Sequence, residues 1–281
     1  MRLGGPVLTG YEDPDQWVAA LRERGYSAAY CPLEADADDD TVRALVKATR
    51  AADIVIAEVG AWSNPLSPDP EIRKQALTYC KQRLHLADRL GARCCVNIAG
   101  SRGTSWDGPQ PDDLTEATFG LIVETVREII DEVQPTQTYY TLETMPWMYP
   151  DSADSYLSLL EAIDRERFAV HLDPANLICS PQRYFRNTRI LRECFDKLGP
   201  FIRSCHAKDV ILREQFMVHI DETRPGLGKL DYTTFLRELS RLPADTPLML
   251  EHLSTEEEYR LAADHIRSVA AAANLPLHGQ R

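Results

Sequence analysis

The sequence lacks any long apolar segment. Residues 1 to 10 contain no run of the length of a secretory signal, and no later stretch reaches the roughly 20 apolar residues of a membrane span. Linkers rich in serine and glycine and low-complexity segments are also missing. These absences predict a protein without a membrane partner, located in the cytoplasm, with one domain over residues 1 to 281.

Basic residues are also in short supply. The chain has 31 lysines and arginines against 43 acidic residues, which gives a net charge of −12. A surface of this charge repels a phosphate backbone, so we expect no nucleic-acid partner. A dinucleotide-binding loop is missing too, because the glycines at 100 to 103 and 226 to 228 lack the G-x-G-x-x-G spacing after a first strand.

Seven cysteines are present, and most of them lie inside apolar runs. Buried thiols in such runs behave as small hydrophobic groups. Cys94 and Cys95 are adjacent, but neighbours on a strand point to opposite faces and do not readily chelate together. We therefore interpret the cysteines as reduced and structural.

Short aliphatic or β-branched runs alternate with amphipathic stretches. Eight runs are candidate strands: residues 3 to 8, 27 to 31, 53 to 60, 93 to 100, 138 to 145, 168 to 173, 203 to 209 and 247 to 253. Between them, the stretch from Glu71 to Leu90 repeats apolar residues at helical spacing and Gly91 supplies its stop. Strict alternation requires a parallel sheet, and without a phosphate loop the closed form is favoured. The sequence predicts an α/β fold, a single (β/α)8 TIM barrel.

Four of the later predicted strands end in a side chain that can bind a metal. These side chains are Glu143 in TLETM, Asp173 in HLDPAN, His206 in CHAKD and Glu251 in LMLEHL. Because the carboxyl ends of all barrel strands meet on one face, we expect the four to converge. Three carboxylates and one imidazole form a mostly hard ligand set, which suits Mn2+ first and also Mg2+, Co2+ or Zn2+.

Each of these residues alone has a simpler explanation, since a carboxylate at a strand end is often a helix cap or an ion-pair partner. Their joint occurrence favours the metal, because unpaired buried carboxylates are costly and the neighbouring sequence offers no compensating charge. The sequence therefore predicts one divalent metal ion at the strand ends.

The segments around these residues resemble the xylose-isomerase-like barrel superfamily, which contains sugar isomerases and keto-sugar 3-epimerases. The resemblance covers nearly the whole chain and rests on AEVGAWSNPL, ADRLGAR, LETMPW, HLDPAN, CHAKD, RPGLGKLDY and LEHL. The same segments also resemble those of other enzymes with this barrel: inosose dehydratases, hydroxypyruvate isomerases, enzymes that cleave C-glycosides after oxidation, and endonucleases acting at abasic sites.

The resemblance to the epimerases implies that the four predicted ligands bind the metal in the same order, with Glu143 and Glu251 also acting as the acid/base pair. It implies an isomerase or epimerase of carbohydrate metabolism that acts on a ketose or keto-sugar through a cis-enediolate. It further implies a small-molecule sugar substrate and a homo-oligomer.

One departure from the epimerases keeps an alternative open. Those enzymes carry a further histidine shortly after the aspartate ligand, where this sequence has Asn176 in DPAN. A metal-dependent dehydratase or lyase begins with the same proton abstraction and then expels a leaving group. An endonuclease is disfavoured by the charge of −12, and a non-catalytic binding module by the retained ligand set.

Three neighbours of the predicted ligands are candidates for further roles. His171 lies two residues before Asp173 and points into the barrel, as a hydrogen-bonded core histidine, a histidine that supports the ligands from behind, a ligand itself or a substrate-binding residue. Lys208 lies two residues after His206 and either neutralises an enediolate oxygen, as a catalytic residue, or forms a solvated salt bridge. Asn176 either binds a substrate hydroxyl and orients Asp173 or caps the next helix.

Other candidates lie in the loops that follow strands. The substrate-binding candidates there are three tryptophans and two arginines: Trp62, Trp106, Trp147, Arg213 and Arg224. Tryptophan rings pack against a sugar or against their own loop, and the arginines bind a phosphate or carboxylate or lie at the surface. Both arginines belong to a long connection over residues 210 to 228. His252 is expected to point outward, because it neighbours the inward-pointing Glu251.

Overall fold

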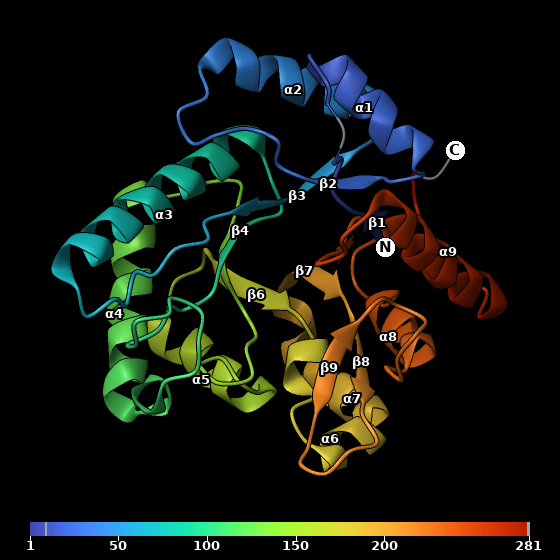
Figure 1. Cartoon of the computed structure of the whole chain (residues 1–281). Helices are drawn as coiled ribbons and strands as arrows, with labels where there is room; N and C mark the ends of the chain where they lie inside the picture. Colours follow the sequence, from blue (N-terminus) through green and yellow to red (C-terminus); the bar gives the residue numbers. More distant parts are fainter. Residues whose placement is uncertain (9, 280–281) are drawn as a thin grey trace.

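The computed structural model describes residues 1–8 and 10–279. Eight parallel strands close into a barrel with helices around it (Figure 1), in the order β1-β10-β7-β6-β5-β4-β3-β2. The barrel strands are β1 (Arg2–Gly4), β2 (Ala28–Tyr30), β3 (Val55–Gly60), β4 (Cys94–Asn97), β5 (Tyr140–Glu143), β6 (Phe168–Leu172), β7 (Ile202–Ala207) and β10 (Pro247–Leu250). Each of the eight predicted runs overlaps one of them, so the predicted barrel is confirmed.

The helices lie outside the barrel and connect successive strands. They are α1 (Pro14–Glu23), α2 (Asp39–Ala51), α3 (Pro70–Leu90), α4 (Glu116–Val133), α5 (Ala153–Ile163), α6 (Pro181–Phe185), α7 (Asn187–Leu198), α8 (Tyr232–Leu239) and α9 (Glu256–Ala272). Short 3-10 turns occur at η1 (Pro111–Leu114), η2 (Ala175–Leu177) and η3 (Gly199–Phe201). In the described part of the chain, no helix combines the length and the apolar character that crossing a bilayer requires.

Polar side chains fix where several helices begin and end. Ser152 caps α5 and Asp231 caps α8 by accepting backbone N–H groups that have no partner inside the helix. Gly91 ends α3 in the left-handed region with φ 65°, where a side chain would be strained. The local sequence signals thus set the helix lengths that carry the chain from one barrel strand to the next.

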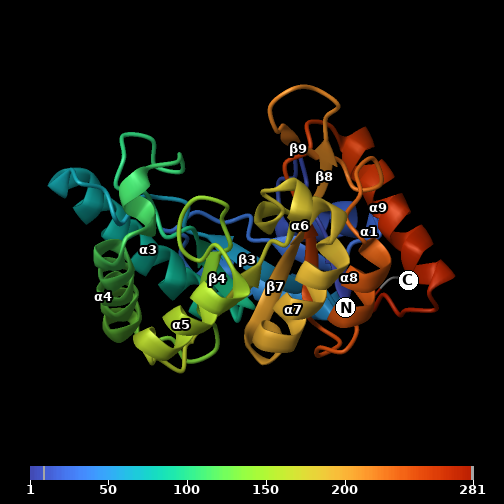
Figure 2. The same cartoon turned by 90° about the horizontal axis from the view of Figure 1, so that it is seen from below.

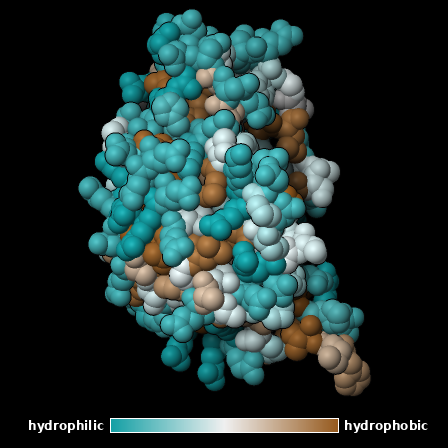
Figure 3. Space-filling model, turned by 90° about the vertical axis from the view of Figure 1, so that its left-hand side faces the viewer, coloured by the Kyte–Doolittle hydropathy of each residue, from teal (hydrophilic) through white to brown (hydrophobic). Residues whose placement is uncertain are grey.

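The main hydrophobic core lies where the helices pack on the strands. Leu84 of α3, Ile129 of α4 and Leu159 of α5 are fully buried in one continuous apolar cluster. Burying each such side chain contributes roughly 1.5 to 3 kcal/mol relative to leaving it in water. The side of the molecule seen in Figure 3 is mostly hydrophilic, as this inward packing requires.

The connection between β7 and α8 differs from the long loop that the sequence predicts. It contains an antiparallel hairpin, β8 (Asp209–Leu212) and β9 (Ile220–Thr223), which projects beyond the barrel (Figure 2). Its tip exposes Phe216 completely, and Met217 takes a left-handed φ of 65°. The sequence predicts the length of this connection but not the hairpin inside it, because each hairpin strand has only four residues and neither shows a clear alternation of apolar and polar side chains.

Candidate metal centre and cavity

The structure brings the four predicted ligands together at the carboxyl ends of their strands. Glu143 is the last residue of β5, Asp173 follows β6, His206 lies in β7 and Glu251 follows β10. One ligand atom from each lies within 4.8 Å of the others. Three of the four residues are buried and Glu251 is partly buried. A single ion of ordinary size can therefore contact all four side chains.

The imidazole of His206 faces the carboxylates through Nδ1. This nitrogen lies 2.9 Å from Glu251 Oε2, 3.2 Å from Glu143 Oε1 and 3.8 Å from Asp173 Oδ2. Burial lowers the pKa of His206, but the surrounding carboxylates, Glu251 first among them, outweigh burial and raise that pKa well above its ordinary value. Without a metal, this imidazole therefore holds a proton that a metal would have to displace.

Lys208 shares the same carboxylates. Its Nζ lies 2.8 Å from Glu251 Oε2, 2.9 Å from Asp173 Oδ2 and 3.5 Å from Glu143 Oε1. Burial raises the pKa of Asp173, but the ammonium of Lys208 and the imidazole of His206 together outweigh burial and hold that pKa below its ordinary range. In the same way, the carboxylates raise the pKa of the buried lysine. Lys208 is thus a permanently charged part of the site and not a solvated surface lysine.

Two features of this arrangement fit a divalent cation. Asp173 Oδ2 and Glu251 Oε2 are buried and accept no well-directed hydrogen bond, although Lys208 lies close to both. Three negative charges come from the carboxylates of Glu143, Asp173 and Glu251, and the ammonium of Lys208 compensates one of them. With His206 neutral, as metal binding requires, the remaining charge of −2 is what one divalent ion neutralises, and hard oxygen donors with one imidazole suit such an ion.

The turn after β6 explains how Asp173 is aimed. Its Oδ1 accepts the backbone N–H of Ala175 at 2.9 Å and of Asn176 at 3.3 Å, which leaves Oδ2 for the site. The side chain of Asn176 donates to Glu143 Oε1 at 3.1 Å. Asn176 therefore links the turn to Glu143 by its side chain and to Asp173 by its backbone.

The candidate metal centre opens into a cavity of about 830 Å³. Its wall includes Glu143, Glu251 and Lys208 of the centre and the predicted residues Trp62, Trp106, Trp147 and Asn176. Val218, Ile220 and Glu222 of the hairpin complete one side. Within the described residues, the wall contains no arginine. The three tryptophans are each between a third and two fifths exposed, so their rings are available to a ligand.

Three predicted substrate-binding residues lie outside the cavity wall. Arg213 is paired with Asp221 at 2.7 Å across the hairpin, and Arg224 Nη1 donates to the backbone oxygen of Pro225 at 3.3 Å. His171 is completely buried inside the barrel. The arginines are held by the hairpin and the loop after it and His171 lies deeper in the barrel, so the structure does not bring these three side chains to the cavity.

His252 contradicts its predicted outward orientation, since it lines the cavity. Strand β10 ends at Leu250, so the alternation of side chains does not extend to residue 252. His252 instead takes a left-handed φ of 56°, which is uncommon for a residue other than glycine. Its Nδ1 lies 3.2 Å from Glu222 Oε2, and this hydrogen bond raises the pKa of His252. Neither His252 nor Glu222 was a predicted site residue.

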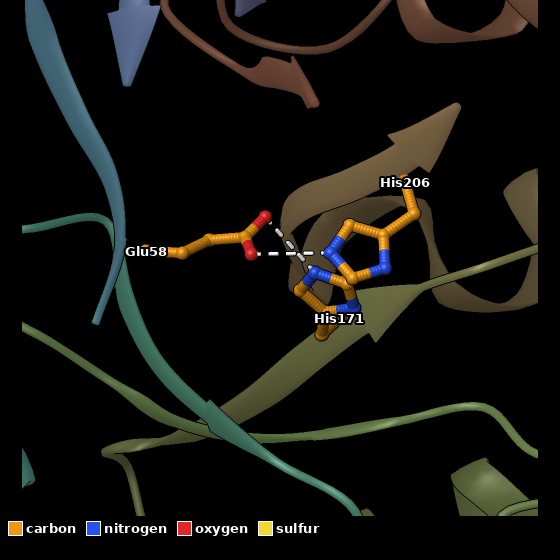
Figure 4. A group of neighbouring side chains, drawn as sticks. All are labelled: Glu58, His171 and His206. Carbon is orange, nitrogen blue, oxygen red and sulfur yellow. Dashed lines mark hydrogen bonds and ion pairs between the residues drawn. The ribbon is translucent and has the colours of Figure 1, made fainter. Parts of the chain in front are cut away.

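Glu58 in β3 is a further residue that the sequence reasoning missed. Its carboxylate points into the barrel toward the imidazoles of His171 and His206, one oxygen to each ring (Figure 4). The available signal was a charged residue inside the apolar run DIVIAEVG, which is unusual for a buried strand. The signal alone does not reveal the partners of that charge.

Comparison with known proteins identifies the family to which the chain belongs. A family model described as xylose isomerase-like TIM barrel matches residues 15–269, whereas no curated protein matches the sequence. Similar solved structures include a xylose isomerase-like protein from Mycobacterium smegmatis in complex with magnesium, which has 17% identity, a TM-score of 0.68 and 97% coverage of both chains. The probable 3-DHS dehydratase AsbF from Bacillus anthracis has 17% identity and a TM-score of 0.70, with 96% of this chain and 99% of that chain covered.

A third similar structure is the D-psicose 3-epimerase from Clostridium cellulolyticum H10 with D-tagatose. It has 15% identity and a TM-score of 0.67, with 96% of this chain and 99% of that chain covered. At such low identity these structures support the fold alone. The family model, in contrast, matches most of the sequence, and the chain therefore belongs to the xylose isomerase-like TIM barrel family.

Proposed function

We propose that this chain is a divalent-metal-dependent isomerase or epimerase that acts on a neutral ketose or keto-sugar. The observation that carries the proposal is the convergence of Glu143, Asp173, His206 and Glu251 within 4.8 Å at one end of an aromatic cavity. Mn2+ is the ion we propose first, and Mg2+, Co2+ and Zn2+ suit the same donors. When bound, such an ion supplies a Lewis acid that polarises a substrate carbonyl.

The proton transfer itself is assigned to two side chains. Glu143 and Glu251 come from different strands, and both line the cavity as well as the candidate metal centre. A carboxylate on each side of the substrate can remove the proton beside the carbonyl and return one to the other face, by way of a cis-enediolate. Lys208, which is charged and lines the same cavity, stabilises the negative charge that develops on the substrate oxygen.

The cavity favours an uncharged substrate. Its wall carries four carboxylates, Asp107, Glu143, Glu222 and Glu251, while Lys208 is already shared among three carboxylates of the centre. The arginines that could have held a phosphate lie elsewhere. Tryptophan faces bind the C–H surfaces of sugars without requiring charge. We therefore propose a neutral sugar as the substrate and not a sugar phosphate.

Deuterium incorporation tests this function directly. Chelator-stripped protein is reloaded with Mn2+ and incubated with neutral ketoses and their phosphate esters in deuterated water, and proton NMR follows the carbons beside the carbonyl. We expect metal-dependent exchange with at least one neutral ketose, and none with the Glu251→Gln variant. Absence of exchange with every sugar on the panel contradicts the proposal for that panel, and exchange with the phosphate esters alone contradicts the neutral substrate.

A lyase reaction is the second candidate, and the position of His252 favours it. An elimination needs an acid near the leaving group, and His252 faces the cavity beside Glu251, with its Nε2 3.6 Å from Glu251 Oε1. Ultraviolet absorption of an enone product separates this outcome from epimerisation. An enone that forms with the wild type and is lost in His252→Asn would assign the chain to the lyases.

A further inference from the structure

A buried polar network lies behind the candidate metal centre. Glu58 Oε1 lies 3.0 Å from His171 Nε2, and Glu58 Oε2 lies 3.2 Å from His206 Nε2. Ser204 Oγ donates to Glu58 Oε1. The four residues come from β3, β6 and β7, and none is more than 1% exposed. Figure 4 shows three of them, Glu58, His171 and His206. The network therefore joins opposite parts of the barrel interior through one carboxylate.

This carboxylate depends on the two imidazoles. An ionised carboxylate buried without donors is costly, and among the described residues no lysine or arginine is paired with Glu58. A buried carboxylate oxygen needs a hydrogen-bond donor, which His206 Nε2 can supply to Oε2, and His171 Nε2 and Ser204 Oγ to Oε1.

The need of Glu58 for a donor determines which nitrogen of His206 is left for the centre. If Nε2 carries the hydrogen that Glu58 accepts, the lone pair that a metal needs is on Nδ1. Nδ1 is the atom that lies 2.9 Å from Glu251 Oε2 and 3.2 Å from Glu143 Oε1. The same hydrogen bond prevents the ring from turning away from the carboxylates.

We propose that Glu58 is a positioning residue that fixes the tautomer and the ring orientation of His206 for metal binding, and that His171 and Ser204 hold Glu58 in place. This inference rests on the proposed metal-dependent function. It also explains why a histidine as deeply buried as His171 is compatible with the core, since its Nε2–H serves Glu58 and not the substrate. Carboxylates that orient metal-binding histidines commonly change the metal affinity by about 10- to 100-fold when they are removed.

Glu58, His171 and His206 are also close enough to suggest a second metal site. We favour the positioning role because the separations of 3.0 and 3.2 Å are those of ordinary hydrogen bonds. In the described part of the chain, neither Glu58 nor His171 lines the cavity, whereas Glu143 and Glu251 of the candidate metal centre do, so an ion has no comparable route to Glu58. The two interpretations differ in the number of metal ions bound per chain, which is one in the positioning role and two in the other.

Metal titration of Glu58→Gln tests the proposal. Calorimetry with Mn2+ on chelator-stripped protein measures affinity and stoichiometry, and circular dichroism checks the fold. We expect one ion per chain in the wild type and an affinity about 10- to 100-fold weaker in Glu58→Gln, because the amide replaces one of the two acceptor oxygens by an NH2 group, which faces an imidazole as a donor. Asp113→Asn is the matched control, since Asp113 is another fully buried carboxylate, bonded to Ser101 and Arg102 away from the centre, and its loss should leave the affinity unchanged.

A measurement on the wild type alone covers the case in which Glu58→Gln does not fold. Long-range proton–nitrogen NMR of the Zn2+-loaded protein reports the tautomer of each histidine, and we expect a protected Nε2–H on His206. A hydrogen on Nδ1 overturns the proposal, as does an unchanged affinity in folded Glu58→Gln or a stoichiometry of two. A wild type that binds no divalent ion overturns the proposed function as well, whereas absence of turnover with normal metal binding leaves the role of Glu58 intact.

Discussion

Replacing Lys208 by methionine separates the roles that this residue plays in the candidate metal centre. The ammonium lies 2.8 Å from Glu251 Oε2 and 2.9 Å from Asp173 Oδ2, which are the oxygens that a metal would also use. Methionine keeps most of the side-chain volume and removes the charge. The substitution therefore leaves three carboxylates in the centre without their lysine partner.

The size of the effect follows from the charges. Two unit charges about 4 Å apart interact by roughly 4 kcal/mol at an effective dielectric constant of about 20, so an ammonium and a dication repel each other by about twice that amount. In the wild type, the flexible lysine can move away from the ion toward Glu222, which lies 3.9 Å from its Nζ, and this movement already reduces the repulsion. We therefore expect Lys208→Met to remove only about a third of the full repulsion. That fraction corresponds to metal binding about 100-fold tighter in Lys208→Met.

The metal-free protein should respond in the opposite direction. Removing one partner of a buried ion pair typically costs about 3 to 5 kcal/mol, because the remaining charge stays buried. We therefore expect Lys208→Met to be less stable than the wild type in the presence of a chelator and to recover most of the difference in saturating Mn2+. Turnover should still fall, because the charge that stabilises the developing oxyanion is missing.

Calorimetric titration with Mn2+ and urea unfolding with and without chelator measure these two quantities. Lys81→Met is the matched control, because Lys81 also contacts two carboxylates, Glu128 and Glu132, but on the outer helices. It should change neither the metal affinity nor the response to chelator. Weaker metal binding in Lys208→Met would refute the reasoning, since it would mean that the lysine orients the ligands and does not compete with the ion.

Two further predictions concern substrate binding and acid stability. Trp147→Ala should raise KM about fivefold with kcat little changed, because an aromatic wall contact worth roughly 1 kcal/mol acts on substrate and transition state alike. Trp147→Phe should retain most of the substrate affinity. Equal KM values for the wild type and Trp147→Ala in steady-state kinetics would contradict this substrate contact. Asp88 accepts the backbone N–H groups of Thr136, Gln137 and Thr138, and these bonds outweigh burial and lower its pKa. The stability that comes from this lowered pKa is fully present above the unfolded-state pKa of 3.8 and is lost as the pH falls through the folded-state pKa. Asp88→Asn should therefore lower the free energy of unfolding by about 1 kcal/mol at pH 7 and by less at pH 3. An equal loss at both pH values in urea titrations would argue against this role of Asp88.

The barrel and the convergence of four side chains could be predicted because each depends on local patterns. Apolar runs mark the strands, and a parallel barrel places every strand end on one face. Glu143, Asp173 and Glu251 each stand at or just after a strand end, so the rule that locates the strands also locates these side chains.

The features that were missed depend on contacts or dihedral angles that local sequence does not encode. Glu58 has partners in β6 and β7, and no pattern within β3 identifies them. The direction of His252 depends on one left-handed residue after β10, and strand periodicity does not extend to it. The β8–β9 hairpin is stabilised by pairing between strands of four residues, which is too short for a reliable alternation.

Because of the hydrogen bonds of Glu58, metal binding by the second half of the barrel depends on the first half. These hydrogen bonds join positions 113 and 148 residues apart, so they form only after the first half of the barrel meets the second. A fragment that begins at β5 would contain all four candidate ligands, yet its His206 would lack the carboxylate supplied by β3. The amino-terminal half contributes none of the four candidate ligands but supplies this carboxylate, so two separately produced halves should recover full metal affinity only when they are mixed and associate.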